Sequence, residues 1–260
     1  MARRSTIGTS DFGRLLFWGG LLLGIGVLLL GVGLPLVYLV LRAFDSGGSA
    51  FADLLFRERN LVLLWNTLLL TGGVLCVSSL IAFPLAWLTT RTSMRGKRVW
   101  SLVGVLPLAI PSYLMAYAVL SMGGNVGVVA ELTGVVFPRF EGYWGCVAIL
   151  SLCNFPYLFF NLRASLLTLD PALEDVAYSL GHSHYQVVLH VFLPQLKPAF
   201  LSGGLLISLH VFSEFAAVSQ MHYETLSFAL YRQYIAGMNS SYGACIALML
   251  IGVTAVFVVI

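Results

Sequence analysis

Charged residues are scarce in this sequence: Asp, Glu, Lys and Arg make up 10% of its 260 residues, whereas 59% are hydrophobic. The mean hydropathy is +0.92. A soluble globular chain carries about 25% charged residues, so this composition excludes a soluble globular protein and indicates an integral membrane protein. The net charge of +3 is too small to indicate nucleic acid as a partner.

Cysteines are few, and long polar segments are missing. The four cysteines stand singly in apolar runs, without the spacing of a zinc site or a disulfide framework, at Cys76, Cys146, Cys153 and Cys245. We therefore expect them to be small buried hydrophobic residues. The largest polar block is too short to form a soluble domain, which excludes a membrane-tethered enzyme with a separate catalytic head.

The N-terminus begins like a secretory signal, with basic residues before an apolar run. That run extends from Leu15 to Leu41, about 27 residues, whereas the apolar region of a signal peptide has roughly 7–15 residues and precedes a small-residue cleavage site. No such cleavage site is evident. We therefore expect the segment to be retained as a first transmembrane helix.

Six segments are long and apolar enough to cross a bilayer, whose core of about 30 Å requires roughly 20 helical residues. They are residues 15–41, 62–88, 99–120, 143–162, 199–220 and 243–260. Each should be helical, because lipid cannot hydrogen-bond an open backbone. The predicted fold class is therefore all-α, a polytopic membrane helix bundle with about six transmembrane helices.

The third of these segments contains Pro107 and Pro111. Proline removes a hydrogen bond from the helical ladder and bends the helix, which membrane bundles tolerate. Two interpretations remain open for this segment: a broken helix that lines a pathway, or a kink that serves packing alone.

Lysine and arginine are distributed unevenly between the connections. If the N-terminus is cytoplasmic, nine of them face the cytoplasm: Arg3, Arg4, Arg14, Arg91, Arg95, Lys97, Arg98, Arg163 and Lys197. Five face the other side: Arg42, Arg57, Arg59, Arg139 and Arg232. The positive-inside rule therefore predicts that both termini and the connection 163–198 are cytoplasmic.

The longest polar block, residues 170–194, begins with the features of a short helix. Asp170 can cap free amides, and a proline follows at the first helical position. Glu174 and Asp175 would lie near the positive end of the helix dipole, and Gly181 supplies the left-handed residue that ends a helix. An apolar face is expected from the residues spaced three and four apart, Leu173, Val176, Ala177 and Leu180.

A second short helix should follow directly. Ser183 and Gln186 have the spacing of a capping box, and Leu193-Pro194 is expected to end the helix. Such short helices need a partner surface. Helices that rest on lipid favour Lys and Arg on their polar face, whereas this segment carries acids and histidines, so its composition favours a protein partner.

Within this block, Glu174, Ala177 and Gly181 are followed after nine residues by Val191, and then by Leu193 and Pro194. This spacing resembles the EAA loop of the permeases of ATP-binding-cassette (ABC) importers. The sequence departs from that pattern at Asp175 and Val176, where two small residues often stand, and at Val191, which replaces Ile.

The resemblance extends over nearly the whole chain and is greatest to the ferric-iron branch of these permeases. It is carried by "WNTLLLTGGVLCVSSLIAFPLAWLTTRT", "LPLAIPSYLMAYAVL" and "SEFAAVSQMHYETLSFALYRQY". Thiamine, sulfate and phosphonate permeases share much of the pattern and remain alternatives. Many members of the ferric branch are double-length chains, so the sequence is also expected to correspond to the N-terminal half of a longer permease.

This resemblance implies the fold of a type I importer permease, a bacterial inner-membrane location, and a chain that performs no covalent chemistry. ATP and Mg²⁺ would bind to a cytoplasmic ABC ATPase dimer, and this chain would hold no cofactor directly. A periplasmic or lipoprotein solute-binding protein and a second permease half would be the other protein partners. The residues implied to couple to the ATPase are Glu174, Asp175, Ala177, Gly181, Val191, Leu193 and Pro194.

Ionisable residues inside spans are candidates for a transport pathway. His210 and Glu214 lie four residues apart in the fifth span, so they are expected to share a helix face, and Tyr113 and Tyr117 are further polar groups. A carboxylate, an imidazole and phenols suit a hard ferric ion. The alternative is that His210 and Glu214 only hydrogen-bond neighbouring helices, and a remote one is a membrane enzyme that uses them as an acid–base pair. A metal site at His182, His184 and His190 is not favoured, because only two of them lie near one face.

Overall fold

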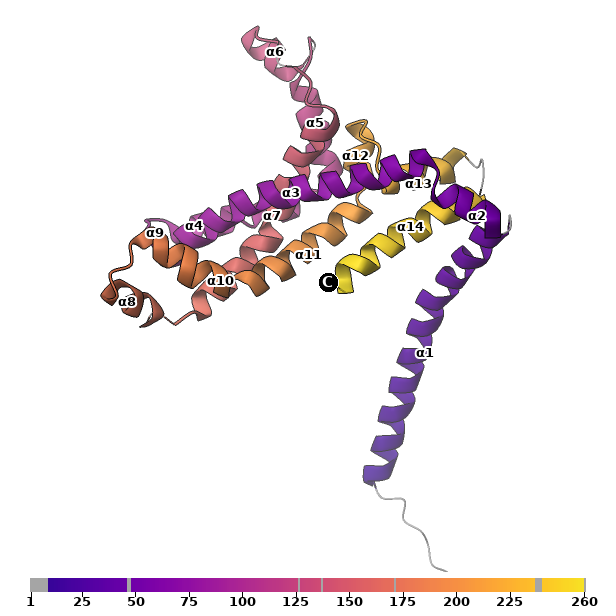
Figure 1. Ribbon diagram of the computed structural model, residues 1–260, viewed down its shortest axis with the longest axis horizontal. Helices are drawn as coiled ribbons and strands as arrows, with labels where there is room; N and C mark the ends of the chain where they lie inside the picture. The colour runs from indigo at the N-terminus through magenta and orange to yellow at the C-terminus, as the bar shows by residue number, and fades with distance from the viewer. Residues whose placement is uncertain are drawn as a thin grey trace, which may run out of the picture.

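A computed structural model describes residues 9–45, 48–125, 127–136, 138–170, 172–236 and 240–259. Its regular elements are all helical over these ranges (Figure 1). They are α1 (Thr9–Phe44), α2 (Gly48–Leu55), α3 (Glu58–Arg91), α4 (Lys97–Val103), η1 (Leu106–Ala109), α5 (Ser112–Met122), α6 (Val128–Thr133), α7 (Gly142–Thr168), α8 (Ala172–Ser179), α9 (His184–Val187), η2 (Val188–Phe192), α10 (Leu193–Gln195), α11 (Lys197–Ser213), α12 (Ala216–Gln220), α13 (Leu226–Ala236) and α14 (Ser240–Val259).

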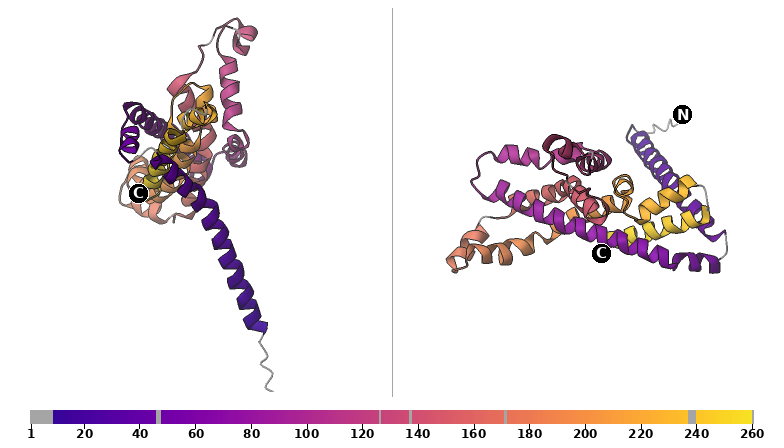
Figure 2. Two further views of the ribbon diagram at one scale, coloured as in Figure 1. Left: turned by 90° about the vertical axis from the view of Figure 1, so that its right-hand side faces the viewer. Right: turned by 90° about the horizontal axis from the view of Figure 1, so that it is seen from above.

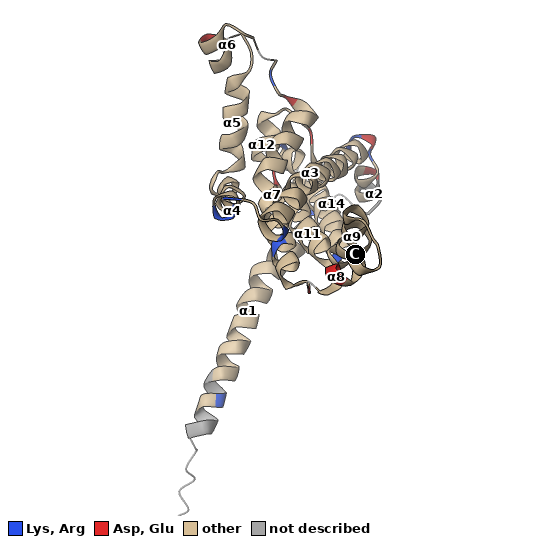
Figure 3. Ribbon diagram, turned by 90° about the vertical axis from the view of Figure 1, so that its left-hand side faces the viewer, with Lys and Arg blue, Asp and Glu red and all other residues tan. Residues whose placement is uncertain are grey.

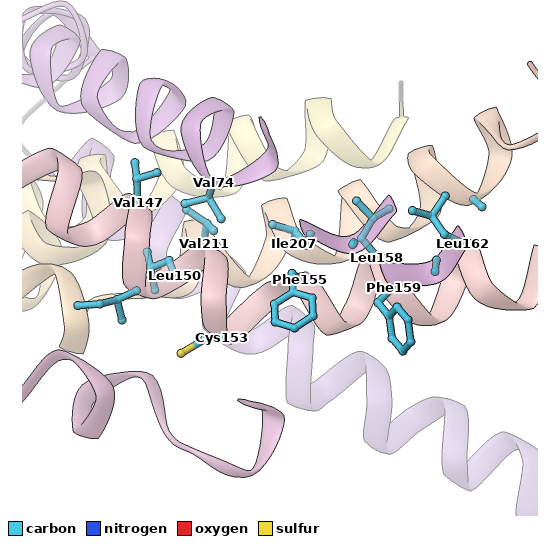
Figure 4. Close-up of a cluster of buried hydrophobic side chains, with 14 of the residues drawn as sticks. Val74, Val147, Leu150, Cys153, Phe155, Leu158, Phe159, Leu162, Ile207 and Val211 are labelled. Atoms are coloured by element: carbon cyan, nitrogen blue, oxygen red, sulfur yellow. The ribbon is translucent and has the colours of Figure 1, made fainter. Parts of the chain in front are cut away.

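The centre of the bundle is the parallel pair α3 and α7, with α11 antiparallel to both (Figure 1). In the most apolar window of α7, 72% of the residues are buried, which makes α7 the innermost long helix described. Its side chains Leu158, Phe159 and Leu162 belong to one continuous apolar cluster with Ile207 and other residues of α11 (Figure 4), and the Phe159 ring lies on the side of Gly104, after α4. This packing explains why α7 is apolar on all sides.

Small residues let these helices approach one another closely. Ser78 Oγ donates to the carbonyl of Ser151 at 3.5 Å, and Ser151 Oγ donates to the carbonyl of Val74 at 3.4 Å, which joins α3 to α7 in the buried interior. Gly203 of α11 lies directly against Leu158 of α7. Serine and glycine at such positions are typical of helix contacts in membranes.

The segment 99–120 is not one straight span. The first half of the segment, α4 followed by η1, ends at Ala109, and Ile110 is extended. The second half, α5, begins after Pro111 and makes an angle of 94° with the first half. The cause is local, because proline lacks an N–H and also disfavours the helical conformation in the residue before it. α5 and α6 then project away from the bundle (Figures 1 and 2).

The segment 199–220 is also interrupted, which corrects the prediction of one continuous helix. α11 ends at Ser213, Glu214 is extended, and the short α12 begins at Ala216. Consequently, Glu214 does not continue the helix face that carries His210, and the expectation that the two residues share a face is wrong.

α1 stands apart from the bundle and has its main contacts, in the described residues, with α2 and α14 near its C-terminal end (Figure 2). No residue in its most apolar window is buried. Within the described residues, four helices are long and apolar enough to cross a membrane, or up to six if each bent pair is one span. A helix that is apolar on all sides yet unburied is suited to lipid or to another transmembrane helix.

The close contact at Gly203 generates a prediction about stability. In a Gly203→Ala variant, the added Cβ would lie 2.7 Å from Leu158 Cδ1 and 2.9 Å from Leu158 Cα, so the helices must separate. We expect a destabilisation of about 1–3 kcal/mol, typical of overpacking, measured as a lower melting temperature in detergent.

Gly72→Ala is the matched control, because a Cβ there meets no atom within 4 Å and alanine is the better helix former. Equal melting temperatures for the two variants would contradict the proposed tight contact.

Candidate functional site

The first helix of the polar block forms as the sequence predicts. Asp170 Oδ1 accepts a hydrogen bond from the amide of Ala172 at 2.9 Å, at the start of α8. Gly181 follows the helix with a φ of +83°, and the amide of His182 donates to the carbonyl of Ala177 at 3.1 Å. The cap at Asp170 and the left-handed glycine are therefore confirmed.

The second helix begins at the predicted capping box. Ser183 Oγ accepts from the amide of Gln186 at 3.4 Å, and the Gln186 side chain accepts from the amide of Ser183 at 2.8 Å. This reciprocal pair is confirmed, and it fixes the direction in which α9 leaves the turn.

The end of that helix differs from the prediction. The chain continues from α9 through the π-helical turn η2 into α10, and Pro194 lies in the first turn of α10 rather than after the helix. Proline is tolerated there because an amide in a first turn has no intrahelical partner. The bend of 62° comes later, at Leu196, between the end of α10 and the start of α11.

Arg91, the last residue of α3, fastens the polar block to the bundle. Its guanidinium donates to the carbonyls of Leu166 at 2.8 Å and Leu169 at 3.0 Å, at the end of α7. It also lies 3.9 Å from a carboxylate oxygen of Glu174 and over the ring of Phe192, 5.0 Å from its centroid. One cation therefore joins α3, α7, α8 and η2.

Aromatic contacts support this arrangement. Trp87 meets the buried ring of Phe192 edge to face, with centroids 5.0 Å apart, and the His184 ring at 6.2 Å. The hydroxyl of Tyr178 lies 2.6 Å from His184 Nδ1 and donates to Glu174 at 3.3 Å. Desolvation and the neighbouring Glu174 carboxylate raise the pKa of Tyr178 above its ordinary value.

The other face of α8 is apolar and exposed. Ala177 is buried, whereas Leu180 is 73% exposed and Val176 is 56% exposed, with Leu173 beside them. Asp175 is exposed on the same helix, and Tyr185 is exposed on α9. We call Leu173, Val176 and Leu180 the α8 apolar face. Figure 3 shows acidic residues on α8 in red, and of the two, Glu174 is the one that pairs with Arg91 of the bundle.

Of the remaining implied coupling residues, Val191 is partly buried in η2, and Leu193 and Pro194 are exposed in α10. The structure thus gathers all seven residues at one end of the bundle (Figure 1).

Glu214 joins the two interrupted spans. Its Oε2 accepts from Ser112 Oγ at 2.7 Å, at the start of α5, and its Oε1 accepts from the amide of Ala217 at 3.0 Å, in α12. Its carbonyl accepts from Ser227 Oγ at 2.6 Å. The side chain is buried, and each carboxylate oxygen has a protein donor.

The other pathway candidates do not gather around Glu214. His210 is exposed on α11, with its ring 5.9 Å from that of Tyr157. Tyr113 and Tyr117 are exposed on α5. In the described residues, the Glu214 carboxylate bonds to Ser112 and Ala217 and the His210 ring lies beside Tyr157, so the geometry gives no support to an acid–base pair. Over the same residues, no group of three His, Cys, Asp or Glu side chains could hold a metal ion.

Sequence reasoning missed Arg91, Trp87 and Ser112. Arg91 was counted only as a positive charge, and its carbonyl partners lie 75 and 78 residues away in the chain. A tryptophan four residues before an arginine at the end of a predicted span is a usable signal, because the two share a helix face.

Solved structures show which class of protein has this fold. A chain of a bacterial alginate ABC transporter superposes with a TM-score of 0.76 at 19% identity, covering 96% of this chain and 94% of that one. A chain of the MetNI methionine ABC transporter gives 0.62 at 16% identity, covering 78% and 94%. The fold is therefore that of ABC importer permeases.

Sequence comparison assigns the family. The profile of the binding-protein-dependent transport system inner membrane component matches residues 78–260, which is more than half of the chain. The chain belongs to this family, and it is a multi-pass inner-membrane protein.

Two curated relatives come from Haemophilus influenzae. The Fe(3+)-transport system permease protein FbpB 2 is 34% identical over 224 residues, 85% of this chain and 41% of the relative. The putative ferric transport system permease protein FbpB 1 is 26% identical over 86% of this chain and 38% of the relative. The molybdenum transport system permease protein ModB of Escherichia coli is 28% identical over 59% of this chain and 69% of the relative. The chain spans about two fifths of the length of the two ferric relatives.

The contacts of Arg91 generate the second prediction. Arg91→Met keeps the length of the side chain but removes two hydrogen bonds and the charge beside Glu174. The two hydrogen bonds go to the end of α7, and α8 is joined through the ion pair with Glu174. Because an incompletely buried ion pair contributes about 1 kcal/mol, we expect hydrogen exchange of the α8 amides to accelerate about fivefold, measured by mass spectrometry.

Arg95→Met is the control, since Arg95 is an exposed residue of the adjoining connection. Unchanged exchange in α8 of the Arg91 variant would show that the guanidinium does not hold the helix.

Proposed function

We propose that this chain is the permease subunit of an ATP-driven, binding-protein-dependent importer, and that α8 and the turn after it dock on a cytoplasmic ABC ATPase. The observation that carries this proposal is that the α8 apolar face is exposed. The opposite side of α8 is joined to the bundle by the ion pair between Glu174 and Arg91. An apolar patch on a fixed support is suited to a protein partner.

The same contacts suggest how force reaches the membrane bundle. A push on α8 acts through Glu174 and Phe192 on Arg91, and Arg91 is bonded to the end of α7. Because α3, α7 and α11 are closely packed, they would move as a rigid group, as in hinge or shear transitions. Gly181 would keep its left-handed turn at the contact surface, and Asp175 would supply charge beside the apolar face.

On this proposal, ATP and Mg²⁺ bind to the ATPase dimer, and this chain holds no cofactor. A solute-binding protein docks on the side opposite α8, and a second permease half, in the same or another chain, completes the pathway. The N-terminus is cytoplasmic, because the basic connection 91–98 lies at the end of α3 that also carries α8.

Ferric iron is the proposed substrate, since two relatives whose alignments cover more than four fifths of this chain are named as ferric permeases. Sulfate is the main alternative, because a sulfate permease of Prototheca wickerhamii is 28% identical over 54% of this chain; thiamine and phosphonate remain further ones. We place the pathway near Glu214 and His210, with Tyr113 and Tyr117 on the projecting α5.

The docking proposal predicts that Leu180→Asp weakens binding of the ATPase subunit. Leu180 is 73% exposed in the turn after α8, so the change should leave folding intact while placing a charge in an apolar contact. We expect an affinity about thirtyfold lower, typical of a central interface residue, measured by titrating purified ATPase onto the permease in detergent.

Leu132→Asp is the matched control, because Leu132 is 79% exposed in α6, which projects from another part of the bundle. Docking through α8 is refuted if Leu180→Asp leaves the affinity unchanged, or if both variants lower it equally.

The substrate proposal predicts which binding protein activates the assembled transporter. In proteoliposomes that contain the whole complex, a ferric-loaded binding protein should raise ATP hydrolysis and carry radioactive iron inside, because docking and transport are coupled. Stimulation by a sulfate-loaded protein instead would correct the substrate without affecting the docking proposal.

A further inference from the structure

A cavity of about 380 Å³ lies between α4 and α7, beside the end of α3. Lys97, Arg98 and Arg163 line it, together with the hydroxyl of Ser101. We call it the α4–α7 cavity. The described residues around it include three cations and no carboxylate, so its electrostatic potential attracts an anion.

Two buried polar atoms of the residues that line the cavity lack protein partners. Ser101 Oγ and Arg163 Nε are buried and form no hydrogen bond within the described residues. A buried polar atom without a partner is costly, and more so on a charged group. The cavity therefore holds hydrogen-bond donors that the protein itself leaves unused.

The walls of the cavity are fixed. A Cβ atom at Gly104 would lie 3.0 Å from Leu85 Cδ2 and 3.1 Å from Phe159 Cε1, so α4 packs tightly against α3 and α7. Phe159 itself is fully buried and forms part of the lining. The donors are thus held in place before any ligand arrives, which lowers the entropic cost of binding.

One side of the cavity is apolar and opens on the exposed outer surface of the bundle. Leu102 is 69% exposed and Phe160 is 44% exposed, and both line it. Trp100, on the same short helix, is 48% exposed, and tryptophan is enriched at the level of lipid headgroups. A ligand that fits must therefore combine an anionic head with a hydrocarbon tail.

We propose that the α4–α7 cavity binds the headgroup of an anionic phospholipid from the bilayer around this chain. The guanidinium groups of Arg163 and Arg98 and the Lys97 ammonium neutralise the charge of the phosphate, and the acyl chains lie along Leu102 and Phe160. The bound lipid would bridge α4 and α7, next to the helix ends that Arg91 fastens.

The test is a titration of phosphatidylglycerol into the purified full chain in detergent, with bound lipid counted by native mass spectrometry. Each cation near a phosphate surface contributes about 1 kcal/mol, so Arg163→Gln should weaken phosphatidylglycerol binding about fivefold. Arg98→Gln should weaken phosphatidylglycerol binding similarly. Because Arg98 is exposed, this second variant keeps the test valid if Arg163→Gln fails to fold.

Arg163→Lys should restore part of the affinity, whereas Arg95→Gln, outside the cavity, should have no effect. Phosphatidylcholine and inorganic phosphate are the comparison ligands. Equal binding of phosphatidylcholine, displacement of the lipid by inorganic phosphate at similar concentrations, or unchanged affinity in both glutamine variants would overturn the proposal.

Discussion

The guanidinium of Arg91 is the interaction on which the α8 end of the bundle depends. α8 is a short helix with a largely exposed apolar face, and such a helix is not stable alone. It is held because one cation reaches the end of α7, the Glu174 carboxylate and the Phe192 ring together. A partly buried guanidinium with several partners is rigid. Any force that acts on α8 is therefore delivered to α3 and α7.

Much of the fold follows from the sequence, because the membrane imposes simple requirements. A span needs roughly 20 apolar residues, and its backbone must be helical; six such segments were identifiable. Local signals were equally informative in the polar block, where Asp170, Gly181 and the Ser183–Gln186 pair act within a few residues of chain. These features are set by neighbours in sequence, so no tertiary information was required to predict them.

The interruption at Glu214 was harder to predict than the one at Pro111, because it involves a distant partner, Ser112, as well as the nearby Ala217. The sequence around Glu214 is apolar enough to continue a helix, yet α11 ends at Ser213 because the carboxylate takes donors from Ser112 and Ala217 instead. Pro111 signalled a bend but not its size of 94°. The same limit applies to the site. The residues 174–194 that the resemblance implies for coupling were recognisable from their spacing, and their coupling role stays a prediction, whereas Arg91 is defined by carbonyls more than 70 residues away.

The polar contacts of Arg91 and of Glu214 lie in two parts of the bundle that differ in how tightly they are packed. α3, α7 and α11 interlock through buried side chains and close contacts at small residues (Figure 4), and well-packed interiors deform little. The interrupted spans are different, since a break leaves backbone groups that a side chain must satisfy, as Glu214 does between α11, α12 and α5. Exchanging those donors costs less than repacking α7. Motion started at α8 would therefore pass unchanged along α3 and α7 and be taken up at the break that Glu214 holds.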